Sequence, residues 1–222
     1  PAYASQEVQA AIELLALNAD ADSRGAVFTR REVVDFILDL SGYTADQPLH
    51  EKRLLEPSFG AGDFLLPIIE RLLSAWRAAR PKTTAFEDLN DAIRAVELHH
   101  DTYRDTYAAV VELLKREGMT SKTAQALTDC WLSQGDFLLE PLEGEFDFVV
   151  GNPPYVRQEL IPATLLAEYR IRFETIYDRA DIYIPFIERS LKVLSNGGML
   201  GFICSDRWMK NRYGGPLRSL VA

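Results

Sequence analysis

Residues 148–155 read Phe-Val-Val-Gly-Asn-Pro-Pro-Tyr, an apolar run that stops at an amide side chain, two prolines and an aromatic ring. Such a run is typical of a buried strand that leads into a rigid loop. The prolines fix the backbone and remove two N–H donors, which leaves the Asn152 side-chain oxygen and the carbonyls of Asn152 and Pro153 as hydrogen-bond acceptors. With Tyr155 as a stacking face, the loop suits a planar substrate that carries an NH2 group. The alternative interpretation is a structural turn with Tyr155 packed on the surface.

The sequence before this loop repeats one pattern, in which a short apolar run ends at an acidic residue and a helix follows. Residues 54–56 end at Glu56 and lead through a glycine loop into a helix of about 62–80, and residues 92–98 contain Glu97 and precede a helix of about 101–117. In the loop, Gly60 and Gly62 are expected to adopt backbone angles that other residues avoid and to let a ligand approach the backbone and the helix start. A third strand is predicted at 128–133, shortly before Asp136.

The alternation of strands and helices predicts an α/β fold with a doubly wound, mostly parallel sheet, preceded by N-terminal helices of about 6–19 and 30–41. A fifth strand is predicted at 199–204. The carboxyl ends of parallel strands meet at one edge, where such sheets bind ligands. We therefore expect Glu56, Glu97, Asp136 and Asn152 to line one crevice.

Local signals predict how several helices begin and end. Thr29 is predicted to cap the helix of 30–41, with a glutamate three residues later completing a capping box. Asp181 is predicted to cap a helix that ends at Asn196-Gly197-Gly198. His99 and His100 are interpreted as exposed residues at a helix start. Residues 162–176 are predicted to form an irregular surface helix or a flap beside the site.

Composition limits the class of protein. The 222 residues are 47% apolar and 26% charged, which is ordinary for a soluble globular chain. No apolar run approaches the roughly 20 residues of a membrane span, and no signal peptide is recognisable, so we expect a cytoplasmic protein without a membrane partner. Cys130 and Cys204 are interpreted as small buried hydrophobic residues, and no metal site is expected. The net charge of 24 − 33 = −9 argues against a broad basic surface for nucleic acid, although a local basic lip remains compatible with it.

Together these motifs resemble the S-adenosylmethionine-dependent N6-adenine DNA methyltransferases in the permuted order called the gamma class. The resemblance is strongest to the methylase portion of type IIG restriction–modification and phage-defence enzymes. It implies a Rossmann-like class I methyltransferase fold with S-adenosyl-L-methionine as cofactor. It also implies catalysis by Asn152, Pro153, Pro154 and Tyr155. The implied cofactor-binding residues are Phe28, Thr29, Glu56, Pro57, Ser58, Gly60, Gly62, Phe64, Glu97, Leu98, Asp136, Phe137 and Asn152.

The resemblance implies methyl transfer to the N6 amine of an adenine that is flipped out of double-stranded DNA. It divides the chain into a helical segment of 1–45 that carries the first cofactor motif and a catalytic domain of 46–222. The family continues with further strands and a target-recognition domain after the fifth strand, and neither is visible in this sequence. We therefore expect a fragment of a longer protein, whose recognition or nuclease domain lies elsewhere.

Three alternatives stay open at this point. Similar Asn-Pro-Pro-Tyr loops occur in methyltransferases that act on protein glutamine, an RNA base or the N4 amine of cytosine. A catalytically silent fragment that binds S-adenosylmethionine or DNA is compatible with the acidic charge. A nucleotide-binding dehydrogenase is disfavoured, because the third glycine of the dinucleotide fingerprint is missing.

Overall fold

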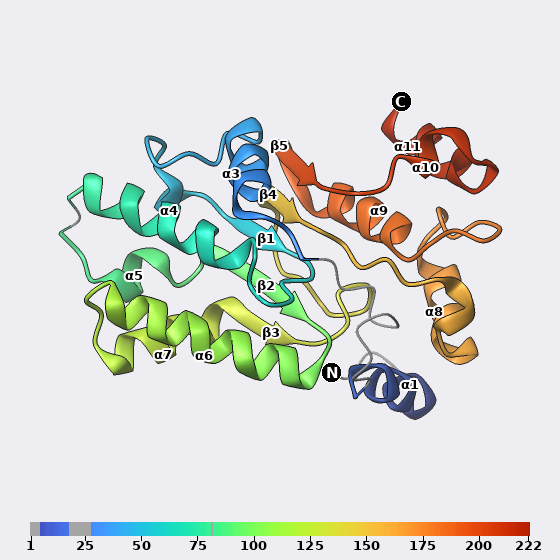
Figure 1. The fold of residues 1–222 in the computed structure, drawn as a ribbon, viewed down its shortest axis with the longest axis horizontal. Coiled ribbons are helices and arrows are strands. Elements are labelled where there is room, and N and C mark those ends of the chain that lie inside the picture. Colours follow the sequence, from blue (N-terminus) through green and yellow to red (C-terminus); the bar gives the residue numbers. More distant parts are fainter. Residues whose placement is uncertain (1–4, 18–27, 81) are drawn as a thin grey trace.

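The computed structural model describes residues 5–17, 28–80 and 82–222. A five-stranded sheet with the order β3-β2-β1-β4-β5 forms its centre, and every neighbouring pair is parallel (Figure 1). The strands are β1 (Leu54–Glu56), β2 (Ile93–Glu97), β3 (Leu132–Gln134), β4 (Phe146–Gly151) and β5 (Leu194–Phe202). The predicted parallel α/β sheet is therefore confirmed.

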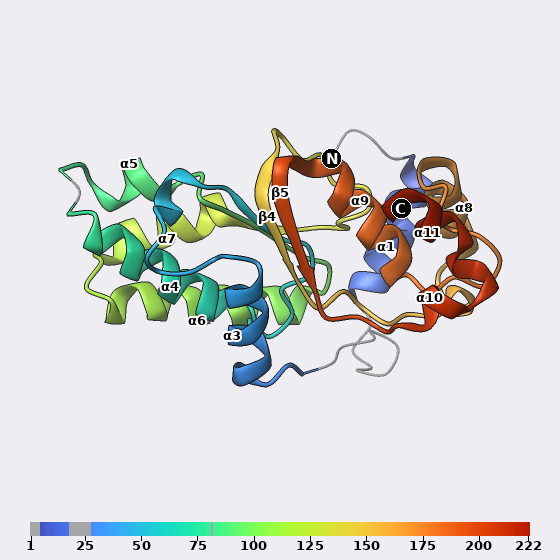
Figure 2. The same ribbon diagram turned by 90° about the horizontal axis from the view of Figure 1, so that it is seen from above.

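Helices cover both faces of this sheet because successive strand residues point to opposite sides. Leu54 and Val150 pack into one core, and their neighbours Leu55 and Val149 pack into the other. The first core is covered by α3 (Arg31–Leu40), α4 (Leu65–Ala78), α5 (Ala85–Leu89), α6 (His100–Arg116) and α7 (Ser121–Trp131). The second is covered by α1 (Gln6–Ala16), α8 (Ala163–Arg172) and α9 (Tyr183–Val193), and Figure 2 shows the sheet between the two groups. Within the described residues, no helix is long and apolar enough to cross a bilayer.

Shorter helical turns connect these elements and extend one end of the molecule. They are η1 (Leu49–Glu51), η2 (Gln158–Leu160), α10 (Arg207–Lys210), η3 (Arg212–Gly214) and α11 (Gly215–Val221). Leu217 of α11 is fully buried against the face of α9 that carries Tyr183 and Ile184. The last described turns therefore pack beside α9, away from the glycine-loop side of the sheet (Figure 2).

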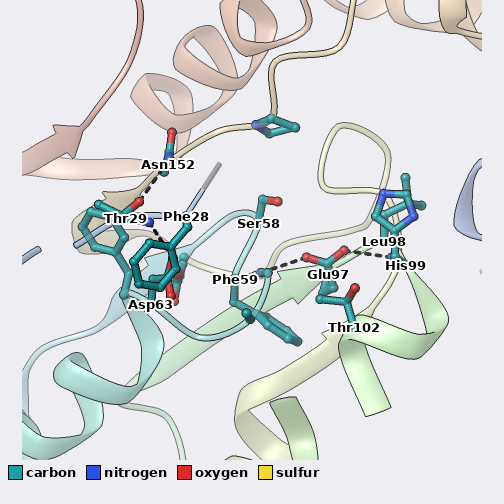
Figure 3. Close-up of a pocket in the computed structure, with 15 residues that line it drawn as sticks. Phe28, Thr29, Ser58, Phe59, Asp63, Glu97, Leu98, His99, Thr102 and Asn152 are labelled. Atoms are coloured by element: carbon teal, nitrogen blue, oxygen red, sulfur yellow. Dashed lines mark hydrogen bonds between the residues drawn. The ribbon is translucent and has the colours of Figure 1, made fainter. Parts of the chain in front are cut away.

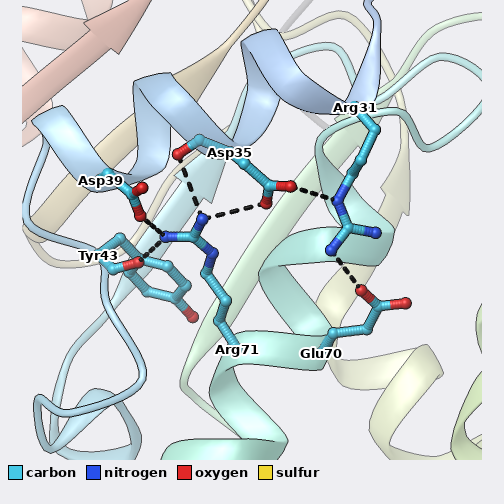
Figure 4. Close-up of polar contacts among 6 residues, drawn as sticks. All are labelled: Arg31, Asp35, Asp39, Tyr43, Glu70 and Arg71. Atoms are coloured by element: carbon cyan, nitrogen blue, oxygen red, sulfur yellow. Dashed lines mark hydrogen bonds and ion pairs between the residues drawn. The ribbon is translucent and has the colours of Figure 1, made fainter.

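Arg71 of α4 holds helix α3 in place (Figure 4). Its guanidinium donates to the carboxylates of Asp39 and Asp35, at 2.5 and 3.0 Å, and to the backbone carbonyl of Tyr43 at 3.0 Å. Burial raises the pKa of the Asp35 carboxyl, but hydrogen bonds from Arg71 and Arg31 outweigh this effect and hold the pKa below its usual value. The helix ends at Leu40, and Gly42, just after the C-cap Ser41, has a φ of 77°, the left-handed conformation that favours glycine. These contacts attach α3 and the turn after it to α4.

The third strand is shorter than the sequence analysis expects. Residues 128–131 belong to α7, and β3 begins only at Leu132. Helix α7 buries Ala124, Leu127, Thr128 and Trp131, whose spacing of three and four is helical. The same spacing turns Cys130 outward, so the expectation of a buried Cys130 is wrong, while Cys204 is partly buried.

Three predicted helix boundaries are also wrong. Helix α3 begins after Arg30, with no side-chain cap, because the Thr29 hydroxyl is used elsewhere. Helix α9 begins after Ile182, not after a capping Asp181. Residues 196–198 lie inside β5, which starts immediately after Val193, so the two glycines do not terminate the helix. The part of the predicted first helix beyond residue 17 lies outside the described residues.

Candidate active site

A cavity of about 330 Å³ opens at the carboxyl ends of the central strands (Figure 3). Glu56 is the last residue of β1, Glu97 is the last residue of β2, and Asn152 directly follows β4. The cavity is within the size range of small-molecule sites. Its lining consists of Phe28, Thr29, Glu56, Ser58, Phe59, Gly60, Ala61, Asp63, Phe64, Glu97, Leu98, His99, Thr102, Asn152 and Pro154.

The glycine loop between β1 and α4 adopts the unusual backbone angles that the sequence predicts. Gly60 has φ 51° and Gly62 has φ 88°, both in the left-handed region. A Cβ at Gly60 would have nothing within 4 Å, so the backbone angle, and not crowding, accounts for this glycine. A Cβ at Gly62 would lie 3.2 Å from the methyl group of Thr106, so this glycine lets the loop pack against α6 and does not line the cavity.

Glu97 joins the glycine loop to the end of β2. Its Oε2 accepts the backbone N–H of Gly60 and its Oε1 accepts that of His99, each at 2.9 Å (Figure 3). The side chain is 3% exposed. Each carboxylate oxygen has more than one acceptor site, so Glu97 can also receive donors from a ligand. The sequence predicts that His99 and His100 are exposed, but both are partly buried. His99 lines the cavity.

Glu56 is a buried carboxyl group in the wall of the cavity. It is 1% exposed, and its Oε2 has no hydrogen-bond partner among the described residues. Burial raises its pKa well above the usual value, and the nearby carboxylates of Asp63 and Glu97 raise it further. An unsatisfied buried oxygen surrounded by negative charge favours a cationic donor.

Two hydrogen bonds attach the segment before α3 to the cavity. The backbone N–H of Thr29 donates to Asp63 Oδ2 at 2.7 Å, and the Thr29 hydroxyl accepts from Asn152 Nδ2 at 3.1 Å. Figure 3 shows the Asn152 nitrogen pointing toward Thr29 and its oxygen pointing away. Phe28 is 77% exposed at the rim of the cavity. The structure therefore brings Phe28 and Thr29 into the same site as the glycine loop.

Only part of the proline loop, residues 152–155, lines the cavity. Asn152 and Pro154 line it, while Pro153 is buried. The ring centroid of Tyr155 lies 5.6 Å from that of Tyr183, and its hydroxyl donates to the carbonyl of Ile203 at 3.3 Å. Tyr155 is therefore next to the cavity and not among its lining residues, and its stacking role stays a prediction.

A smaller apolar extension of about 60 Å³ continues from this cavity beneath the end of β3. The two spaces share Ser58, Leu98 and His99. The rings of Phe137 and Phe186 lie 4.9 Å apart in its wall. The extension is also lined by Leu15, Pro57, Gly135, Asp136, Val156, Ile161, Tyr169 and Ile182. Its apolar walls with one buried carboxylate suit a flat nitrogen-containing ring.

Several residues that line the cavity or its extension are not predicted as site residues from the sequence. Asp63, His99 and Thr102 follow predicted site residues closely, so their positions in the chain could have indicated them. Tyr169 and Phe186 come from α8 and α9, and only the tertiary packing brings them to the extension.

Comparisons with known proteins identify relatives of this chain. Residues 50–222 match the model of the Eco57I restriction-modification methylase family. The type II methyltransferase M.PaeR7I of Pseudomonas aeruginosa is 79% identical over 215 residues, which cover 97% of this chain and 38% of that protein. The type II methyltransferase M.XhoI of Xanthomonas vasicola is 58% identical over 202 residues, which cover 90% of this chain and 37% of that protein.

The fold also occurs in a solved structure, a putative class I S-adenosylmethionine-dependent methyltransferase from Listeria monocytogenes. It superposes with a TM-score of 0.52 at 14% identity and covers 86% of this chain and 49% of that chain. The doubly wound sheet is thus that of the class I methyltransferases. Because the family model matches well over half of its residues, the chain belongs to the Eco57I restriction-modification methylase family.

Proposed function

We propose that the chain is the catalytic part of a DNA methyltransferase that transfers a methyl group from S-adenosyl-L-methionine to the N6 amine of adenine. The observation that carries the proposal is that Asn152 and Pro154 line the same cavity as Glu56, Gly60 and Glu97. A loop of acceptors for an amine substrate and a nucleotide-type glycine loop thus share one space. Both curated relatives reported above are named type II methyltransferases, and the chain spans less than two fifths of their length.

The residues of the cavity suit S-adenosyl-L-methionine, the cofactor that the family and fold imply. The unsatisfied Glu56 carboxyl oxygen could receive its ammonium group, and Glu97 could accept its ribose hydroxyls. The apolar extension, with Phe137 and the Asp136 carboxylate, could hold its adenine. When bound, this cofactor supplies an electrophilic methyl group on a sulfonium.

Asn152 is the residue that we expect to orient the substrate amine. Its side-chain nitrogen is held by Thr29, which directs the side-chain oxygen to the opposite side. This oxygen and the Pro153 carbonyl could accept both hydrogens of an NH2 group and localise its lone pair. Such catalysis works by orientation and electrostatics and requires neither a strong base nor a covalent intermediate.

The substrate amine lies inside a duplex, so the adenine must be flipped out, at a free-energy cost of a few kcal/mol. Stacking on Tyr155 would offset about 1–3 kcal/mol of this. Exposed cations on the turns after β5, including Arg207, Lys210 and Arg212, offer a local surface for phosphates despite the net charge of −9. Recognition of the DNA sequence is assigned to a separate target-recognition domain, and action on chromosomal DNA would place the protein in the cytoplasm.

Product analysis tests this function. Duplex DNA is incubated with the protein and methyl-labelled S-adenosylmethionine and then digested to nucleosides. The proposal predicts label in N6-methyldeoxyadenosine, and a matched reaction with a glutamine-containing release-factor peptide should stay unlabelled. Label in N4-methyldeoxycytidine or in the peptide would contradict the adenine assignment. Failure to bind S-adenosylmethionine in a titration would contradict the function as a whole.

A further inference from the structure

A buried hydrogen bond connects α8 to the apolar extension of the active-site cavity. Tyr169 lies on α8 and is 3% exposed, and its hydroxyl donates to Oδ2 of Asp136. The other carboxylate oxygen, Oδ1, accepts the backbone N–H of Leu138 at 2.9 Å. A residue that follows the proline loop (residues 152–155) thus contacts the acidic residue after β3, 33 positions earlier in the chain.

The surroundings of Tyr169 are apolar, so its hydroxyl needs a partner. Its ring belongs to the second core together with Ile161, Leu165 and Phe173. Both Tyr169 and Asp136 line the 60 Å³ extension. Phenylalanine would fill the same volume, and the hydroxyl adds a directed donor at the one carboxylate in this wall.

The carboxylate of Asp136 benefits from this donor. An isolated carboxyl group in apolar surroundings resists ionisation. Burial raises the pKa of Asp136, while the hydrogen bonds from Tyr169 and from the Leu138 N–H oppose this shift. These two donors also prevent the carboxylate from rotating. Its oxygens retain further lone pairs, so Asp136 can accept one more N–H from a ligand in the extension.

Arg189 holds the backbone of the same loop. Its guanidinium donates to the carbonyls of Phe137 and Glu140 and lies over the Phe137 ring, with its carbon 5.0 Å from the ring centroid. Residues 136–140 are therefore fixed by a side chain from α9 as well as by the one from α8. The loop is fixed before any ligand enters.

We propose that Tyr169 is a positioning residue for nucleoside recognition, whose hydroxyl fixes Asp136 as the acceptor for the exocyclic amine of the cofactor's adenine. This inference rests on the proposed function, because it takes S-adenosylmethionine as the ligand of the cavity. It gives α8 a part in cofactor selection. This helix lies between β4 and β5 in the chain, far from the glycine loop that follows β1.

The test compares two nucleosides that differ only at the amine. Binding of S-adenosylhomocysteine and S-inosylhomocysteine, in which a carbonyl oxygen replaces the amine, is measured by calorimetry on the same protein sample. In Tyr169→Phe, the affinity for the adenosyl compound should fall about tenfold, as expected for one hydrogen bond to a charged group. The affinity for the inosyl compound should stay within about twofold, so the selectivity shrinks about tenfold.

Two further variants separate positioning from stability. Tyr107→Phe removes a similar hydrogen bond, in which the Tyr107 hydroxyl of α6 donates to Asp129 of α7 at 2.7 Å. Neither residue lines the cavity or its extension, so this variant should leave both affinities unchanged. The double variant Tyr169→Phe/Asp136→Ala should bind no worse than Asp136→Ala alone, because the hydroxyl acts through Asp136.

Equal losses for both nucleosides in Tyr169→Phe would show a merely structural role and overturn the inference. Wild-type affinities for both nucleosides in Tyr169→Phe would overturn it as well, while the cofactor assignment would stand. A wild-type protein that binds neither nucleoside would overturn the proposed function and this role together.

Discussion

The side-chain nitrogen of Asn152 lies 3.1 Å from the hydroxyl of Thr29, to which it donates a hydrogen bond, although 123 residues separate the two in the chain. Thr29 is 6% exposed, and its backbone N–H is bound to Asp63 in the glycine loop. The residue is thus a bridge between the loop expected to bind the cofactor and the loop expected to hold the substrate. An amide whose nitrogen is held in this way presents its oxygen in a defined direction (Figure 3).

Replacing the Thr29 hydroxyl should therefore disturb catalysis more than binding. In Thr29→Val, the Asn152 amide loses its acceptor and can rotate, so we expect kcat for methyl transfer to fall about tenfold, or ~1.4 kcal/mol in the barrier. Thr29→Ser keeps the hydroxyl and should retain most of the rate. Single-turnover kinetics with saturating cofactor give the comparison, and equal rates for the valine and serine variants would contradict the bridging role.

The Glu56 carboxyl should make stability depend on pH. Because its pKa is raised in the folded protein, the folded state binds the proton more tightly than the unfolded chain. This contribution is complete below the unfolded value of about 4.3 and is lost as the pH rises from there through the folded pKa. Glu56→Gln should then raise the melting temperature at pH 8 by about 2–4 °C, equivalent to roughly 1 kcal/mol, and the difference should vanish near pH 4. A difference that is constant between pH 4 and pH 8 would contradict this assignment.

Cofactor binding should release a proton from the same group, because an ammonium next to Glu56 lowers its pKa. Calorimetric titrations at neutral pH in two buffers of different ionisation enthalpy detect such a release. We expect the observed enthalpy to depend on the buffer for the wild type and to lose that dependence in Glu56→Gln. Identical buffer dependence in both proteins would place the ammonium elsewhere.

Glu97 has two tasks in the structure, since it ties Gly60 to His99 and faces the cavity. Glu97→Gln keeps the shape but replaces one carboxylate oxygen with an NH2 group, so one of the two backbone N–H groups loses its acceptor, whereas Glu97→Ala releases both. We expect cofactor affinity to fall about tenfold in the glutamine variant and more in the alanine variant, measured by calorimetry. Because a buried N–H left without a partner costs about 1–3 kcal/mol, both variants should lose stability, and the alanine variant should lose more. Wild-type affinity in both variants would remove Glu97 from the site.

Arg71 should contribute to stability far more than an exposed arginine. Its side chain is 15% exposed and binds two carboxylates and two backbone carbonyls of α3 and the following turn (Figure 4). Arg71→Met should lower the free energy of unfolding by about 2–3 kcal/mol. Arg104→Met removes a pair of surface ion pairs at a 69% exposed side chain and should change it by less than about 1 kcal/mol. Urea denaturation measures the free energy of unfolding of both variants. Similar decreases would show that the contacts of Arg71 stabilise the protein no more than exposed ion pairs do.

The central sheet could be predicted because its signals are local. Apolar runs that end in Glu56, Glu97 and Asn152 mark the three central strands, and each of these side chains lies at the carboxyl end of its strand. Parallel pairing then places the three ends at one edge without further information. The backbone angles of Gly60 and Gly62 follow from the residue type in a tight turn.

Contacts between distant residues could not be predicted in the same way. Thr29 has the local sequence of a helix cap, yet its hydroxyl accepts a hydrogen bond from Asn152, and tertiary structure outweighs the capping preference. The strand predicted to begin at residue 128 was wrong. Thr128 and Trp131 are β-branched and aromatic, as in a strand, but they are buried at the spacing of a helix that packs against the core. Tyr169 carries no sequence motif, and its bond to Asp136 depends on the packing of α8 over the sheet.

The most direct test of the account separates cofactor binding from methyl transfer at Asn152. Asn152→Ala removes the amide from the cavity, while Glu56, Gly60 and Glu97 stay in place. Asn196→Ala, at an exposed position of β5 outside the cavity, serves as the matched control. The account predicts that Asn152→Ala binds S-adenosylmethionine within about threefold of the wild type and loses at least a hundredfold in adenine methylation, whereas Asn196→Ala keeps both. Methylation by Asn152→Ala at the wild-type rate would contradict it.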